Sequence, residues 1–171
     1  MFKPYTGLLR HINKQTTAAA VVDIAEAIDN PAYREGAMTG MLIRAVKLIM
    51  DPGNSALGVD NSSYYMVSQL QVGDRSAAPS ILDPDSPWLM SHYENQGALA
   101  TYGRIVLTSP MYHDILKPEP VIVSREFTVY WDGTDAVNFQ SKDVFTLVYY
   151  QNVEVHKDVY HRLLLDQTRT S

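Results

Sequence analysis

The residues of this sequence best suited to metal chemistry are its histidines. There are five of them, spread along the chain: His11, His92, His113, His156 and His161. His156 and His161 are five residues apart, which would place them on opposite faces of a strand and makes a shared metal ion unfavourable. We therefore interpret each histidine as a surface or partly packed residue and predict no metal site.

A second candidate is the acidic segment 83–94, which partly matches a calcium-binding loop. Acidic residues stand at the first, third and last positions of that pattern. The pattern needs Gly at its sixth position for a sharp turn, but Trp88 is there, and Pro87 replaces an expected ligand. We therefore interpret Asp83 and Asp85 as turn-forming or capping residues.

Catalytic signatures are missing from the sequence. It contains no Gly-rich phosphate loop, nucleophile elbow or His-Glu-x-x-His motif. Its lack of Cys excludes disulfides, thiolate metal sites and cysteine nucleophiles. Asp132 and Asp135 fall at an Asp-Gly step that predicts a turn, where Asp is common for conformational reasons. We predict no catalytic residue, no cofactor and no enzyme activity.

Aromatic side chains offer a different kind of site, because the chain has 11 Tyr, 4 Phe and 2 Trp. A sugar-stacking platform could use Trp88, Trp131 and the pairs Tyr64-Tyr65 and Tyr149-Tyr150. Consecutive strand residues point to opposite faces, so only one member of each pair could serve. We favour core or interface packing, with a carbohydrate- or receptor-binding module as the alternative.

Length and net charge limit the class of protein to which this chain can belong. The 171 residues fit one domain, and the net charge of −5 makes the chain a poor nucleic-acid binder by composition. We expect nucleic-acid binding that is weak and sensitive to salt. No apolar run reaches the length of a membrane span, and the first residues lack the apolar core of a signal peptide. The expectation is a soluble or assembly-forming protein made in the cytoplasm.

The elements that would position any site are mostly strands. Runs 121–131 and 144–155 are rich in β-branched and aromatic residues, and in the first Val123, Phe127 and Val129 share an apolar face. Strands are also predicted in these segments: 41–50, 64–73, 102–108 and 159–165. Segment 41–50 also fits a helix, but its polar, Gly-bearing link to 64–73 favours a hairpin.

Other segments are less regular. Residues 16–29 fit either a capped helix or a strand. Residues 74–97 are loop-like with closely spaced prolines, and within them 88–93 fits a short helix or a strand. The pattern predicts a mostly β fold, an antiparallel β-sandwich of single jelly-roll type with short helices and long loops. We expect one domain over 16–171, preceded by an N-terminal arm over 1–15.

The arm mixes apolar and basic residues, and Pro4 and Gly7 argue against a regular element in it. Its large apolar side chains are too many for a solvated tail, so we expect it to pack on its own domain or on a neighbour. The residues predicted to make an inter-subunit contact are Phe2, Tyr5, Leu8, Leu9 and Ile12.

The predicted strands are spread over most of the chain after residue 36, in segments 40–50, 64–73, 102–108, 121–131 and 144–155. Their order and the character of their loops resemble small single jelly-roll viral coat proteins. The resemblance implies a structural capsid subunit, partnered by copies of itself in a homo-oligomeric shell. It also implies a location in the virion, after assembly in the cytoplasm or nucleus of a host cell.

One feature departs from that family. Many such coats carry an Arg-rich N-terminal arm that binds the genome, whereas this arm has only Lys3, Arg10 and Lys14. Genome condensation through the arm is therefore not expected.

Overall fold

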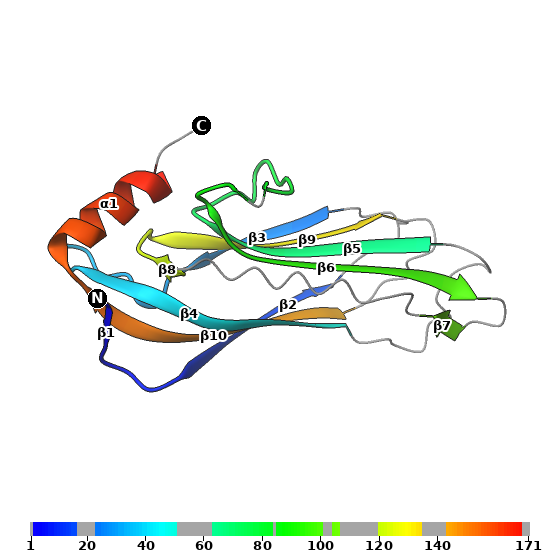
Figure 1. Ribbon diagram of the computed structural model, residues 1–171, viewed down its shortest axis with the longest axis horizontal. Coiled ribbons are helices and arrows are strands. Elements are labelled where there is room, and N and C mark those ends of the chain that lie inside the picture. Colours follow the sequence, from blue (N-terminus) through cyan, green and yellow to red (C-terminus); the bar gives the residue numbers. More distant parts are fainter. Residues whose placement is uncertain are drawn as a thin grey trace.

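A computed structural model describes the chain over residues 2–16, 23–50, 63–83, 85–100, 104–106, 120–134 and 143–168. Within these ranges the chain forms two antiparallel sheets packed face to face, with one helix at one end (Figure 1). Sheet A contains β1 (Phe2–Pro4), β2 (Leu9–Thr16), β4 (Thr39–Met50), β8 (Val121–Ile122) and β10 (Asp143–Val155). Sheet B contains β3 (Asp23–Asp29), β5 (Ser63–Val72), β6 (Leu89–Ala100), β7 (Arg104–Val106) and β9 (Glu126–Thr134). The predicted β-sandwich is confirmed.

Strand pairing follows a nested order along the chain. β5 pairs with β6, β4 with β8, β3 with β9, and β2 with β10, all antiparallel. The first half of the chain therefore runs out and the second half returns beside it, as in one long hairpin folded at residues 73–88. Members of this hairpin alternate between the sheets, whose orders are β1-β10-β4-β8 and β3-β9-β5-β6-β7.

The main core lies between the sheets and is formed by alternating strand residues. In β9, Phe127, Val129 and Trp131 are buried on the inner face, as period-two alternation requires. The predicted apolar face is therefore correct for Phe127 and Val129. The prediction of one strand over 121–131 is wrong, because β8 belongs to sheet A and β9 to sheet B, and Val123 packs in a second core instead of with Phe127. The main core comprises Ala32, Met41, Ile43, Leu70, Val72, Met90, Ile122, Phe127, Val129, Val148 and Tyr150.

A second core lies under the helix α1 (Lys157–Thr168). It comprises Leu42, Val121, Val123, Val153 and Val155, with Phe2, Val159, Tyr160, Leu163 and Leu164 packed against it. Met41 and Ile43 belong to the main core and Leu42 to the second, so the two cores lie on opposite faces of β4. The helix thus covers the face of sheet A that points away from sheet B.

Close contact between β4 and β8 depends on Gly40. A Cβ atom at this position would lie 2.7 Å from Cγ1 of Val121 and 3.2 Å from the carbonyl oxygen of Ile122. Because real side chains do not approach so closely, a larger residue here would push β8 away from the sheet.

Two sequence predictions are wrong at the C-terminal side of the chain. Residues 159–165 form part of α1, since Val159, Tyr160, Leu163 and Leu164 place their side chains on one helical face over the second core. The Asp132-Gly133 step is not a turn, because β9 continues through it to Thr134 and pairs with β5 there.

The other sequence predictions concern segments in which the structure contains a strand. Residues 41–50 and 64–73 are strands, as favoured, and 16–29 resolves toward strand, since β3 begins at Asp23. Residues 88–93 resolve toward strand, since β6 begins at Leu89, and the loop predicted after residue 93 is wrong because β6 continues to Ala100. The expectation of no regular element before residue 16 is also wrong: β1 and β2 both form there.

Candidate functional site

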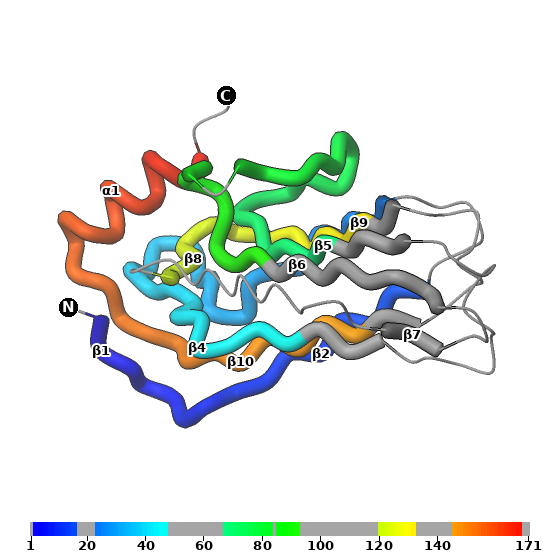
Figure 2. Tube along the Cα trace, turned by 45° about the vertical axis from the view of Figure 1, so that its right-hand side comes forward, coloured from blue at the N-terminus to red at the C-terminus, as the bar shows by residue number. Residues whose placement is uncertain are grey.

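The N-terminal segment forms the edge of sheet A. β1 and β2 both pair with β10, one after the other along its length, and the segment follows β10 in the lower layer of Figure 2. Between the two strands, the Tyr5 amide donates to the Asn152 carbonyl at 3.0 Å and the Asn152 amide donates to the Thr6 hydroxyl at 2.9 Å. The segment is therefore fixed to its own domain along most of its length.

The five apolar residues predicted for an inter-subunit contact separate into two groups. Phe2 is partly buried and packs against the second core. The other four are exposed, with exposed fractions of 43% for Tyr5, 62% for Leu8, 37% for Leu9 and 49% for Ile12. These four side chains stand on an ordered edge and are available for contact with another molecule.

The outer face of sheet A carries cations around a central row of aromatic and apolar side chains. We call this the basic face. It comprises Arg10, Ile12 and Lys14 of β2, Arg44 and Lys47 of β4, and Phe145, Leu147, Tyr149 and Gln151 of β10. Arg10 is opposite Tyr149, Lys14 opposite Phe145, and Lys47 opposite Leu147 in the strand register. Every charged side chain that the structure describes at these strand positions is a cation.

Two contacts orient cations on the basic face. The Lys14 ammonium lies 5.7 Å from the centre of the Phe145 ring, within the range of a cation–π interaction. The Arg44 Nε donates to the Gln151 Oε1 at 2.7 Å. All four basic residues are nevertheless exposed, so their charges can meet an anionic group from outside.

The outer face of sheet B at strands β3 and β9 has the opposite charge. We call this the acidic face. It comprises Asp23, Ala25, Ala27 and Asp29 of β3, and Glu126, Thr128, Tyr130 and Asp132 of β9, of which Thr128 and Tyr130 are buried. Burial raises the pKa of Tyr130, and the negative charges of Asp132 and Asp23 raise it further. The raised pKa of Tyr130 therefore reflects in part the negative potential of this face.

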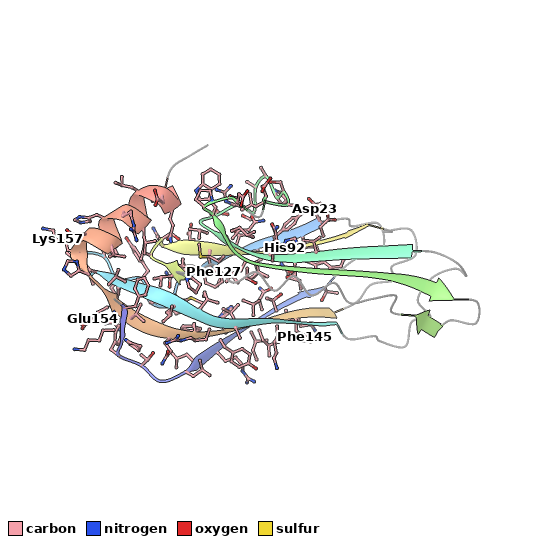
Figure 3. All side chains as sticks on the ribbon, in the orientation of Figure 1. Asp23, His92, Phe127, Phe145, Glu154 and Lys157 are labelled. Carbon is pink, nitrogen blue, oxygen red and sulfur yellow. The ribbon has the colours of Figure 1, made fainter. Side chains whose placement is uncertain are left out.

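The two faces adjoin the same edge of the sandwich, where β2 and β3 meet. Asn13 Nδ2 of β2 donates to Glu26 Oε2 of β3 at 2.7 Å and so joins the edges of the two sheets. Figure 3 shows the two outer sides: Asp23 lies on the sheet B side, Phe145 on the sheet A side, and Phe127 between the sheets.

The interior beside this edge is polar. Asn13, Gln15 and Thr146 are buried, and one oxygen of each has no hydrogen-bond partner. His11 lies nearby with its ring edge-on to Phe127, at 6.1 Å between ring centres. Burial lowers the pKa of His11, and the charge of Glu26 opposes that shift. This cluster could not be predicted from the sequence, because Thr146 and Phe127 are more than 100 residues after the β2 side chains that they lie beside.

The connection 73–88 covers β5 and part of β9 on the outer face of sheet B, where the Arg75 amide donates to the Thr128 hydroxyl and that hydroxyl donates to the Gly73 carbonyl. Gln69 Nε2 donates to the Leu82 carbonyl at 2.9 Å, and the Leu82 amide donates to Gln69 Oε1 at 2.8 Å. Gln71 Nε2 donates to the Ser80 carbonyl at 2.9 Å, and His92 Nδ1 lies 2.9 Å from Gln69 Nε2. His92 is thus a structural partner of a buried amide.

The other predicted chemical residues remain scattered. His156 lies beside Asp158 at 3.7 Å on an exposed part of the chain, His161 is exposed on α1, and His113 lies outside the described residues. Asp83 Oδ1 accepts from the Asp85 amide, which is the turn-forming role expected. Among the side chains that the structure describes, no three His, Cys, Asp or Glu residues form a group that could hold a metal ion.

The proposed sugar-stacking aromatics do not form one platform. Trp131 is buried, and Tyr150 belongs to the main core. Trp88 lies under the Arg75 guanidinium, whose carbon is 4.4 Å from the ring centre. The side chains of Tyr64 and Tyr65 lie outside the described residues.

Within the described part of the chain, the helix is neither long nor apolar enough to cross a membrane. Comparison with known proteins adds no assignment, because no family model matches the chain and no curated protein matches its sequence. Any functional argument therefore rests on the exposed edge and on the two charged faces that adjoin it.

Proposed function

We propose that the protein is a self-assembling structural subunit, the coat protein of a virus or virus-like particle. One observation carries the proposal: four large apolar side chains are exposed on the ordered N-terminal segment, where β2 pairs with β10 on one side and with no second strand among the described residues. Such an edge offers both backbone hydrogen-bonding groups and apolar surface to a second molecule. A subunit of this kind would be found in the virion and would have copies of itself as partners.

The winding of the chain supports the jelly-roll form of the sandwich. Eight strands (β2, β3, β4, β5, β6, β8, β9 and β10) pair in the nested order of a long hairpin that is rolled into two sheets. A double-sheet jelly roll consists of eight strands in two Greek keys, and the architecture is used by viral capsid domains. Lectin domains use it too, so the winding supports the fold type and the exposed edge supports assembly.

Energetics favour assembly through this edge more than through a free arm. Burying a large apolar side chain completely is worth about 1.5–3 kcal/mol. Ordering a flexible segment would cost about 1–2 kcal/mol per residue and would cancel most of that gain. Here β2 is already paired with β10, so most of the ordering is complete before a partner arrives.

The first test is the particle size of the full-length protein, by size-exclusion chromatography with light scattering and by electron microscopy. Shells or defined oligomers are expected. A stable monomer at every concentration, especially one that binds glycans on an array, would overturn the proposal in favour of a carbohydrate-binding module.

Substitutions are a better probe of the edge than deletion. Removing the first 15 residues would remove β1, most of β2 and the packing of Phe2, and so would damage the fold itself. Leu8→Ser combined with Ile12→Ser should instead leave a folded domain that assembles poorly. Ile81→Ser is a matched control, because Ile81 is 43% exposed but lies on the connection 73–88. Equal assembly of both variants would exclude the edge as the contact.

A further inference from the structure

We propose that neighbouring subunits associate through unlike faces, with the basic face of one copy against the acidic face of the next. The inference rests on the proposed self-assembly and specifies which surfaces meet. Both faces belong to every subunit, and they lie on opposite outer sides of the sandwich beside the edge joined by Asn13 and Glu26.

Charge determines the orientation of the contact. If two copies met through the same face, as in a two-fold dimer, the four cations of one copy would lie against the four cations of the other, or carboxylates against carboxylates. Like charges placed opposite one another disfavour association, whereas the basic and acidic faces are complementary. The favoured contact is therefore heterologous, and repetition of such a contact gives a closed ring or an extended array.

The two surfaces also match in shape and polarity. On β2, Ile12 projects between Arg10 and Lys14, which are two residues before and after it on the same face. On β3, the small residues Ala25 and Ala27 lie between Asp23 and Asp29. An apolar centre bordered by charges on one copy would thus meet an apolar centre bordered by opposite charges on the other, as in packed sheets.

A second copy of this chain fits the basic face better than a nucleic acid. Four cations would give only a shallow, salt-sensitive interaction with a single strand. The chain as a whole carries a net charge of −5, which opposes the approach of a long polyanion. The acidic face of a neighbour supplies the same number of carboxylates in a fixed arrangement.

The test reverses the charge of one face at a time. Arg44→Glu with Lys47→Glu makes the basic face acidic, and Asp23→Lys with Asp29→Lys makes the acidic face basic. All four side chains are exposed, so the substitutions should leave the domain folded, which circular dichroism can verify. Each variant alone should need at least about tenfold more protein for half-assembly, since losing several exposed ion pairs gives an effect of this order. An equimolar mixture of the two should recover assembly.

A control with the same change in net charge as the basic-face variant is Arg34→Glu with Lys157→Glu, because both residues are exposed but belong to neither face. This variant should assemble like the wild type. Its failure would show that net charge alone governs assembly and would overturn the inference.

The remaining outcomes separate the two proposals. A wild-type protein that never assembles would refute the proposed function itself. Wild-type assembly with unaffected single-face variants, or a mixture that does not recover, would refute only the pairing of unlike faces. Loss of binding to a labelled single-stranded oligonucleotide by the basic-face variant, with normal assembly, would assign that face to nucleic acid instead.

Discussion

Two regions of the sandwich differ in how their surfaces are covered: the end that carries α1, and the edge where β2 and β3 meet. Both are built from the same kind of alternating strands. At the helical end both faces of sheet A are buried, and the connection 73–88 covers sheet B. At the β2–β3 edge the outer faces carry exposed charged side chains around partly or fully buried ones, and the interior contains Asn13, Gln15 and Thr146.

The contrast indicates a division of work within one small domain. Apolar burial on two faces stabilises the helical end, because it removes large apolar side chains from water. The β2–β3 edge contributes less burial and leaves polar oxygens without a hydrogen-bond partner. A partner could therefore bind at this edge with little effect on the stability of the domain.

The strongest test of this contrast is Phe127→Ala. Phe127 is fully buried in the main core, and its truncation should lower the free energy of unfolding by about 3–5 kcal/mol. Ile12→Ala on the open edge should change it by less than about 0.5 kcal/mol, because that side chain is 49% exposed. Urea denaturation of the monomeric protein measures both. Similar losses for the two variants would abolish the distinction between the regions.

A second test concerns how α1 is fastened to sheet A. Gln167 Nε2 donates to the Val121 carbonyl at 2.7 Å, and its Oε1 accepts from the Val123 amide at 2.9 Å and the Ser124 amide at 3.2 Å. Gln167→Ala would leave these buried backbone groups unsatisfied and should cost about 2–3 kcal/mol.

The control for Gln167 is Leu165→Ala on the same helix, where the side chain is 60% exposed. We expect it to change stability by less than about 0.5 kcal/mol. If Gln167→Ala is equally mild, the helix is held by its apolar contacts alone.

Local pattern was enough to predict β4, β5 and β10, because the strand period of two can be recognised in consecutive residues. Phe127 and Val129 were assigned to the buried face for that reason. The helix over 157–168 was missed because its apolar residues also fit a short strand, and only packing on the second core selects the helical spacing. Asp132-Gly133 was misread because pairing with β5 overrides its turn preference.

The charged faces could not be predicted from the sequence. Arg10 and Lys14 are more than 25 residues before Arg44 and Lys47, and the two pairs share a face only because β10 lies between their strands. Net charge averages over both faces and hides their opposite signs. Sequence reasoning did identify Leu8 and Ile12 as candidates for contact, since large apolar residues next to basic ones are unusual in a solvated tail.

A third test examines the link between the two edges. Asn13→Ala removes the hydrogen bond to Glu26 and should cost about 0.5–1.5 kcal/mol, less than either change at the helical end. Asn13→Asp should cost more at neutral pH, because it places a second carboxylate next to the first. Glu26→Gln retains an acceptor for Asn13 and serves as the control. A larger loss for Glu26→Gln than for Asn13→Ala would contradict this account of the link.

The smallest effect expected is a dependence of stability on pH through His11. Burial lowers the pKa of His11 from its usual value of 6.5, so the unfolded chain binds a proton more readily than the folded one. Stability should therefore be complete above pH 6.5 and should fall with decreasing pH, until the lowered pKa of the folded state is passed. His11→Gln should remove this slope. Glu26→Gln should steepen it, because the Glu26 charge opposes the lowering of the His11 pKa. Urea denaturation at a series of pH values, with an NMR titration of His11, measures both changes. A slope that survives His11→Gln would assign the pH dependence to another group, and one unchanged by Glu26→Gln would show that the β2–β3 edge does not couple these two side chains.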